Sequence, residues 1–147
     1  MDQELDAVLE SRPQRRLIGI APDEPVYEAI RLMAEENIGA VLVLVGNRLV
    51  GIVSERDYAR KVILQGRSSK ETPVSEIMSS PVITVSPQHT VGQCMHIVTD
   101  KRIRHLPVVE GGKVLGMISI GDLVNWVMLE QERTIRHLEA YISGSLT

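Results

Sequence analysis

Apolar residues recur along the chain in two alternating patterns. The first stretch, Leu17–Ile20, is typical of a short strand, and a proline follows it. The next apolar residues lie three, four and seven positions apart, as on one face of an amphipathic helix. Two almost continuous apolar runs come next, Ala40–Val45 and Leu49–Val53, and the pair Gly46-Asn47 between them is typical of a tight hairpin. With a further helix from Asp57, the pattern predicts the order β-α-β-β-α.

The same order returns 65 residues further along the chain. The segment from Ile20 aligns without a gap with the segment from Val85. Identical residues fall at Pro22/Pro87, Val26/Val91, Ile38/Ile103, Val43/Val108, Gly46/Gly111, Gly51/Gly116, Ser54/Ser119 and Asp57/Asp122. An internal repeat of this kind indicates two copies of one supersecondary unit.

The second copy predicts its own elements at matching places. A strand is expected at Val82–Val85, a turn at Glu110–Lys113 and a helix from Asp122. The helix faces of the two copies pair Val26, Ala29, Ile30 and Met33 with Val91, Cys94, Met95 and Val98. One unit of about 45–50 residues is marginal by itself, so we expect the two copies to share a core.

The predicted fold class is therefore α/β (α+β), with two β-α-β-β-α repeats related by a pseudo-twofold axis and forming one compact pair. We expect residues 1–64 to form the first repeat with its lead-in, residues 65–73 a polar linker, residues 74–130 the second repeat, and residues 131–147 a C-terminal helix and tail. Asp122–Ile142 contains no Pro or Gly, which predicts one long helix. Its apolar positions either pack in the core or form a homodimer interface: Leu123, Trp126, Val127, Ile135, Leu138 and Ile142.

Composition and charge exclude several classes of function. The net charge is −3, and aromatic residues are scarce, with no Phe, three Tyr and one Trp. Such a chain offers neither the basic field nor the stacking platforms that nucleic acids need. No window approaches the ~18 apolar residues of a membrane span, and the acidic start is unlike a signal peptide. We expect a soluble, cytoplasmic protein that binds neither nucleic acid nor membrane.

The sequence contains none of the common catalytic or phosphate-binding motifs. The G-x-x-x-x-G-K-[ST], G-x-G-x-x-G, G-x-S-x-G and H-E-x-x-H patterns are all missing. The four histidines do not have the spacing of metal ligands, and the single cysteine, Cys94, falls on the apolar face of a predicted helix. We therefore expect no catalytic residues, no metal site and no enzyme, with Cys94 as a buried packing residue.

A Gly-h-h-Ser-x-x-Asp segment, in which h is apolar, occurs once in each copy, at Gly51–Asp57 and Gly116–Asp122. Ser followed three residues later by Asp is the pattern of a capping box, which stabilises a helix start by ~1 kcal/mol. The same geometry exposes a hydroxyl and a carboxylate beside the helix start, where a ribose diol or a phosphate can bind. Its recurrence at matching points favours a ligand site, and the capping interpretation stays open beside it.

These features resemble a known family. The paired β-α-β-β-α units, the stretch Ile103–Val109 with its Leu-Pro-Val-Val, and the two Ser-x-x-Asp ends look like a tandem cystathionine-β-synthase (CBS) domain pair. The resemblance covers about residues 5–130. Ser54–Met78 is similar to small stand-alone bacterial CBS-pair proteins described as signal-transduction proteins.

The resemblance implies a non-catalytic regulatory module for energy or redox sensing. Such pairs bind adenosine derivatives (AMP, ADP, ATP, NAD or S-adenosylmethionine) in two clefts between the repeats, and they commonly assemble as disc-shaped homodimers. We expect the signal to pass to an unknown effector protein or to a change of oligomer. The alternatives are a ligand-free protein-interaction or dimerisation module and, third, a nucleotide hydrolase.

In similar pairs each cleft is crossed, because the ribose Asp comes from one repeat and the adenine-lining segments come from the other. The resemblance therefore implies a first site formed by Ser54, Arg56, Asp57, Val82, Ile83, Arg104, His105 and Pro107. It implies a second site formed by Ser119, Asp122, Ile18, Gly19, Gly39 and Ala40.

The two implied sites differ in charge. The second repeat has Arg104 and His105 where the first repeat has Gly39 and Ala40. Charged donors bind phosphate about twice as strongly as neutral ones, so the first site is expected to favour a phosphorylated nucleoside. Arg56 and Arg60 would help, as would linker residues Ser68, Ser69 and Lys70; solvent-exposed strand ends are the alternative interpretation of Arg104 and His105.

Overall fold

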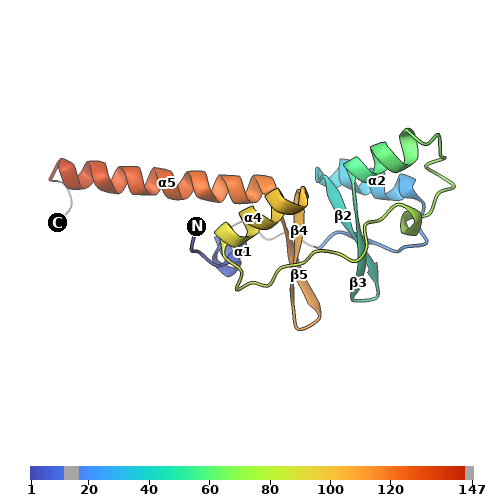
Figure 1. Ribbon diagram of the computed structural model, residues 1–147, viewed down its shortest axis with the longest axis horizontal. Helices are drawn as coiled ribbons and strands as arrows, with labels where there is room; N and C mark the ends of the chain where they lie inside the picture. Colours follow the sequence, from blue (N-terminus) through green and yellow to red (C-terminus); the bar gives the residue numbers. More distant parts are fainter. Residues whose placement is uncertain (12–16, 145–147) are drawn as a thin grey trace. The chain divides into compact units, whose positions relative to one another are not determined.

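The computed structural model describes residues 1–11 and 17–144. Contacts divide these residues into two compact units. One unit comprises residues 17–84 and 107–116, and the other comprises residues 1–11, 85–106 and 117–144. Figure 1 labels the helices and strands along the chain. None of the helices within the described ranges is long and apolar enough to cross a bilayer.

The unit of residues 17–84 is built on a three-stranded sheet in the order β1-β2-β3. β1 (Gly19–Ile20) runs parallel to β2 (Ala40–Val45), and β2 is antiparallel to β3 (Arg48–Ser54). Gly46 opens the β2–β3 turn at φ +61°, a conformation that glycine adopts without strain. The hairpin pairs Ala40 with Ser54, so the start of β2 lies beside the end of β3.

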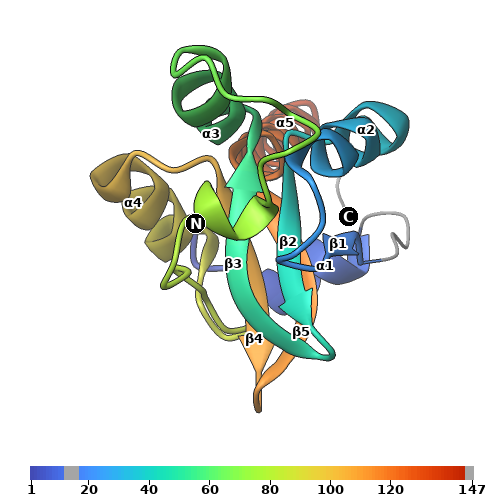
Figure 2. The same ribbon diagram turned by 90° about the vertical axis from the view of Figure 1, so that its right-hand side faces the viewer.

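Helix α2 (Val26–Glu36) buries its apolar face in the core of this unit. Val26, Ala29 and Met33 are buried on it together with β-strand residues such as Val41 and Val43. α2 and the short helix α3 (Glu55–Tyr58) lie at the end of the β2–β3 hairpin away from its turn (Figure 2). A π-helical turn, η1 (Ala59–Ile63), continues α3. The predicted helix face and hairpin are thereby confirmed.

The segment expected as a linker is folded against the first copy. Val26 N–H donates to the carbonyl of Thr72 at 2.8 Å, and Tyr27 N–H donates to that of Ser69 at 2.9 Å. A single 3₁₀ turn, η2 (Val74–Glu76), follows, and Ser79 then exchanges backbone hydrogen bonds with Ile52 of β3. These bonds extend the edge of the sheet beyond β3.

The other unit contains three helices: α1 (Leu5–Ser11), α4 (Val91–Lys101) and α5 (Ile120–Ile142). α4 packs against α5. The N-terminal segment joins the start of α4, because Leu5 N–H donates to the His89 carbonyl and Val91 N–H donates to the Gln3 carbonyl. A second hairpin, β4 (His105–Glu110) with β5 (Lys113–Ser119), leads into α5, and its residues 107–116 belong to the unit of residues 17–84.

The two copies repeat each other in detail. α2 ends at Asn37 and α4 ends at Arg102, both in the left-handed region at φ 53° and 55°. Each of these residues lies 65 positions from its counterpart, which confirms the gapless alignment of the copies. The mixed α/β fold with a long C-terminal helix is confirmed as well, since α5 continues to Ile142.

Three details of the prediction are wrong. Residues 82–84 form no strand, and Val85 forms only an isolated bridge. This segment lies between Pro81 and Pro87, which have no amide hydrogen to donate to a ladder. The strand predicted at Leu17–Ile20 shortens to Gly19–Ile20, and the helices predicted from the two aspartates start two residues earlier, at Glu55 and Ile120. The bounds given above for the two repeats, the linker and the tail stay a prediction.

Candidate functional site

The first candidate site is the junction between β3 and α3. Ser54 ends the strand in an extended conformation, and its hydroxyl accepts from Asp57 N–H at 3.1 Å. The Asp57 carboxylate returns to the start of the helix, where its Oδ2 accepts from Ser54 N–H at 2.9 Å and from the Ser54 hydroxyl at 3.0 Å. This reciprocal pair is a capping box, and it holds a hydroxyl and a carboxylate in one fixed geometry.

The junction between β5 and α5 has the same construction. Asp122 N–H donates to Ser119 Oγ at 3.1 Å, and Ser119 N–H donates to Asp122 Oδ2 at 2.9 Å. In each copy, the backbone N–H of the first helical residue also donates to the carbonyl of the residue that directly precedes the hairpin. Glu55 N–H reaches Gly39 O at 3.1 Å, and Ile120 N–H reaches Arg104 O at 2.8 Å. The two candidate sites therefore share the same pattern of backbone hydrogen bonds at the junction between strand and helix.

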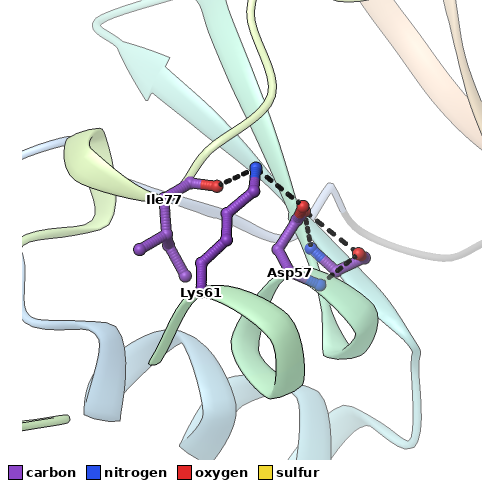
Figure 3. Close-up of polar contacts among 4 residues, drawn as sticks. Asp57, Lys61 and Ile77 are labelled. Atoms are coloured by element: carbon purple, nitrogen blue, oxygen red, sulfur yellow. Dashed lines mark hydrogen bonds and ion pairs between the residues drawn. The ribbon is translucent and has the colours of Figure 1, made fainter. Parts of the chain in front are cut away.

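Lys61 supplies a contact that the sequence analysis missed. Its Nζ lies 3.1 Å from Asp57 Oδ1 and donates to the Ile77 carbonyl at 2.9 Å. Figure 3 shows the ammonium group between the carboxylate and the carbonyl. The two oxygens of Asp57 are engaged by the cap and by Lys61, and its side chain as a whole stays 14% exposed. The spacing of four residues on one helical turn is the signal that could have indicated this pair.

The second copy has Trp126 at the position that matches Lys61. The indole Nε1 of Trp126 is buried and, among the described residues, has no hydrogen-bond partner. An unsatisfied buried donor is costly, whereas the ammonium of Lys61 has two partners in the chain and is partly exposed to solvent. Asp57 and Asp122 therefore have the same kind of cap, but the residue four positions further along the chain differs between the two copies.

The remaining candidate residues fall into two groups. In the unit of residues 17–84, Ile18 O accepts from Leu42 N–H, and Gly19 pairs with Leu42, so the first strand lies beside the strand that Ala40 begins. Within each unit, the structure places the candidates as follows: Ile18, Gly19, Gly39, Ala40, Ser54, Arg56, Asp57, Val82, Ile83 and Pro107 in one, and Arg104, His105, Ser119 and Asp122 in the other.

Exposure separates the candidates further. Arg56, Ile83 and Arg104 are exposed, and the side chains of Ala40 and Pro107 are buried. Gly19 has a packing role of its own, since a Cβ there would lie 2.5 Å from Leu44 Cδ1. Two of the linker residues expected to reach a phosphate have side-chain partners within the chain, and the Lys70 ammonium lies 5.2 Å from the centre of the Tyr27 ring. The Ser69 hydroxyl lies 2.8 Å from Tyr58 Oη.

Neither a thiol nor a metal centre accompanies these sites. Cys94 is fully buried, as predicted, and desolvation raises the pKa of its thiol from 9.0 to about 11. A neutral thiol of this kind is a poor nucleophile. In the part of the chain that the structure describes, no group of three or more His, Cys, Asp or Glu residues is arranged to hold a metal ion.

Comparison with known proteins identifies the class. The model of the CBS domain matches twice, at residues 9–63 and 74–129, and the chain therefore belongs to the CBS-domain family as a tandem pair. The match assigns one domain to each copy of the repeat. CBS-pair proteins are in general regulatory modules, and stand-alone pairs of this kind are among the solved structures that this chain resembles.

Three similar proteins illustrate how this chain compares in sequence and structure with other members of the family. A structure of a protein with CBS domains from Burkholderia ambifaria MC40-6, provisionally described as a signal-transduction protein, is 49% identical with a TM-score of 0.85, covering 88% of this chain and 96% of that one. The mitochondrial CBS domain-containing protein CBSX3 of Arabidopsis thaliana is 45% identical over 127 residues, which are 83% of this chain and 62% of that protein's length. The protein PAE2072 of Pyrobaculum aerophilum, solved in complex with AMP, shares the fold at 24% identity and a TM-score of 0.72, covering 82% of this chain and 89% of that one.

Proposed function

We propose that this chain is a non-catalytic regulatory module that binds an adenine nucleotide (AMP, ADP, ATP or NAD) in clefts between its two repeats. The supporting observation is the duplicated Ser-x-x-Asp junction. In both copies a hydroxyl and a carboxylate are held rigidly by backbone hydrogen bonds and stay partly exposed. A carboxylate has about four acceptor positions, so the cap and Lys61 leave room on Asp57 for a ribose hydroxyl.

The proposed roles follow the chemistry of each side chain. Asp57 and Asp122 accept from the ribose diol, next to Ser54 and Ser119. Charged donors bind the phosphate of the first site, and small or apolar groups line the adenine of each site. The phosphate donors are Arg56, Arg104 and His105, and the adenine-lining residues are Val82, Ile83 and Pro107 in the first site and Ile18, Gly19, Gly39 and Ala40 in the second.

A related fold that was solved with AMP supports an adenosine-type ligand, and it does not choose among the nucleotides. All candidates share adenine and ribose, which are the parts that the proposed residues contact. Discrimination would come from the phosphate end, where charged donors give the stronger hydrogen bonds. We therefore expect the first site to bind AMP or ATP more tightly than adenosine.

Calorimetric titration with AMP, ATP and NAD tests this function. We expect Asp57→Asn to weaken binding at one site by roughly tenfold or more, because a hydrogen bond to a charged group is lost. Asp122→Asn is expected to act on the other site alone. Asp100→Asn removes an exposed carboxylate on α4 and is the matched control. Unchanged affinity in both site variants would remove the aspartates from the ribose role.

A ligand-free interaction module is the second candidate. One observation favours it: both Ser-x-x-Asp pairs are fully used as capping boxes, which is a sufficient structural reason for their presence. Under this function, no adenosine compound at millimolar concentration would raise the melting temperature. In either case we propose that the module acts as a homodimer and transmits its state to a separate effector protein.

A further inference from the structure

The second half of α5 extends beyond its contacts with α4 (Figure 1). From residue 131 to residue 142 only Ala140 is not exposed. Helical stability in proteins comes mostly from packing of an apolar face rather than from intrinsic propensity. The second half of α5 continues a packed helix but buries little surface of its own within the described chain, so a partner surface would stabilise it.

One face of α5 carries a heptad pattern. Six positions alternate in steps of four and three residues, and we call them the α5 seam: Val124, Met128, Gln131, Ile135, Leu138 and Ile142. Their apolar members are 42%, 54%, 54%, 57% and 82% exposed in chain order. A spacing of 3.5 residues is the repeat of a helix that packs along another helix in a coiled coil.

We propose that the α5 seam binds the seam of a second copy of this chain, with the two helices parallel and in register. The area agrees with such an assembly. Five apolar side chains, each more than 40% exposed, offer roughly 500 Å² per copy, so two copies would bury about the 1,000 Å² that a specific interface needs.

The residue types along the seam favour a parallel dimer. Ile135 and Ile142 occupy a positions, and Leu138 lies at the d position between them. Ile at a with Leu at d is the combination that selects two parallel strands. Gln131 occupies the preceding d position, where in register it meets its own counterpart. A side-chain amide has both a donor and an acceptor, so two glutamines facing each other satisfy one another.

The charges beside the seam disfavour the antiparallel arrangement. Glu132 and Glu139 lie at e positions. In an antiparallel pair that aligns Ile135 with Leu138, the e positions of one helix lie beside the e positions of the other. Glu132 of each copy would then lie against Glu139 of the second copy. In the parallel pair e faces g, where each glutamate meets an uncharged residue, Val127 or Thr134. Like charges at these positions reduce pairing, so the parallel form is favoured.

This assembly requires no nucleotide, so it is tested on the full chain without ligand by sedimentation equilibrium. We expect the protein to be a dimer, and Leu138→Glu to raise the dimer dissociation constant by roughly 100-fold or more, since it places a charge in the seam of both helices. Leu129→Glu is the matched control, because Leu129 is 48% exposed on the same helix but outside the seam. It should leave the constant unchanged, with circular dichroism confirming that both variants fold.

Disulfide cross-linking tests whether the two α5 helices pair in parallel and in register. With Cys94→Ala as background, Gln131→Cys should cross-link the two copies on mild oxidation, whereas Arg133→Cys, on the outer face of α5, should not. Three results would overturn the proposal: a chain that stays monomeric, which would assign the seam to a different protein; a dimer that Leu138→Glu leaves intact; or cross-linking through Arg133→Cys as efficient as through Gln131→Cys.

Discussion

Lys61 joins the carboxylate of Asp57 to the backbone carbonyl of Ile77. The two contacts, 3.1 Å and 2.9 Å, connect the helical turn after β3 with the segment that leaves the first copy. Ile77 is buried in the core of the same unit, so a single ammonium group ties a candidate ligand-binding residue to a packed part of the fold.

Lys61→Met should lower the free energy of unfolding by about 1 kcal/mol. The Lys61 side chain is 45% exposed, so water screens its ion pair, and most of the loss comes from the unpaired carbonyl. Urea denaturation measures the change. Lys70→Met is the control, because the Lys70 ammonium lies 5.2 Å from the Tyr27 ring and contacts no core carbonyl. Equal losses in the two variants would show that the bridge has no special role.

The capping boxes give a prediction that separates stability from binding. Ser54→Ala, Ser119→Ala and Thr90→Ala each remove the hydroxyl of a capping box, and each should cost ~1 kcal/mol of stability. Thr90 caps α4 with Gln93 and belongs to neither proposed site. Thermal melts measure the shared loss of stability.

Nucleotide titration of the same three variants measures the difference between them. If the serines serve the ligand as well as the helix, affinity falls in Ser54→Ala and Ser119→Ala and stays at the wild-type value in Thr90→Ala. A fall of equal size in all three variants would mean that the lost affinity only reflects lost stability, and the serines would then be caps alone.

Gly51 is required by the packing of Met78. A Cβ on Gly51 would lie 2.9 Å from Met78 Cγ, closer than side-chain atoms normally approach, and 3.1 Å from Met78 Cβ, which is also a tight contact. Gly51→Ala should therefore destabilise the protein by about 1–3 kcal/mol through overpacking. Adding Met78→Ala should reduce the cost of Gly51→Ala, because it removes Met78 Cγ and leaves only the Cβ contact at 3.1 Å.

Gly46→Ala is the control for this cycle. Gly46 has φ +61° and no atom within 4 Å of a Cβ built on it, so alanine there is strained by the backbone alone. Its cost should be independent of Met78→Ala, as expected for sites that share no contact. A Gly51→Ala cost that Met78→Ala leaves unchanged would contradict the packing explanation.

Local patterns predicted most of the fold, because they act through neighbours in sequence. The helix face at Val26 and Met33, the Gly46-Asn47 hairpin and both Ser-x-x-Asp junctions depend on spacing that the sequence displays directly. The repeat also predicted that whatever forms at Ser54 forms again at Ser119.

Features that depend on distant partners could not be predicted in this way. Nothing in the polar run after η1 indicates that Ser69 and Thr72 carbonyls accept from the first turn of α2. The apolar stretch at Val82–Val85 satisfies a strand pattern but has no ladder partner that would make it one. The repeat does not indicate the contact of Lys61 with Asp57, because the matching residue in the second copy is Trp126, which cannot form an ion pair.

Cys94 gives a prediction about pH. Burial raises the pKa of its thiol from 9.0 to about 11 in the folded chain, so the folded state keeps its proton where the unfolded state has lost it. The stabilisation is complete below pH 9 and is lost as the pH rises through 11, by roughly 3 kcal/mol in all. Lysines and tyrosines titrate in the same range, so the useful quantity is the difference between wild type and Cys94→Ala. We expect the free energy of unfolding of wild type to fall more steeply than that of Cys94→Ala between pH 9 and 11 in urea titrations. Parallel profiles would contradict the raised pKa, because they would mean that the thiol ionises as easily in the folded chain as in the unfolded one.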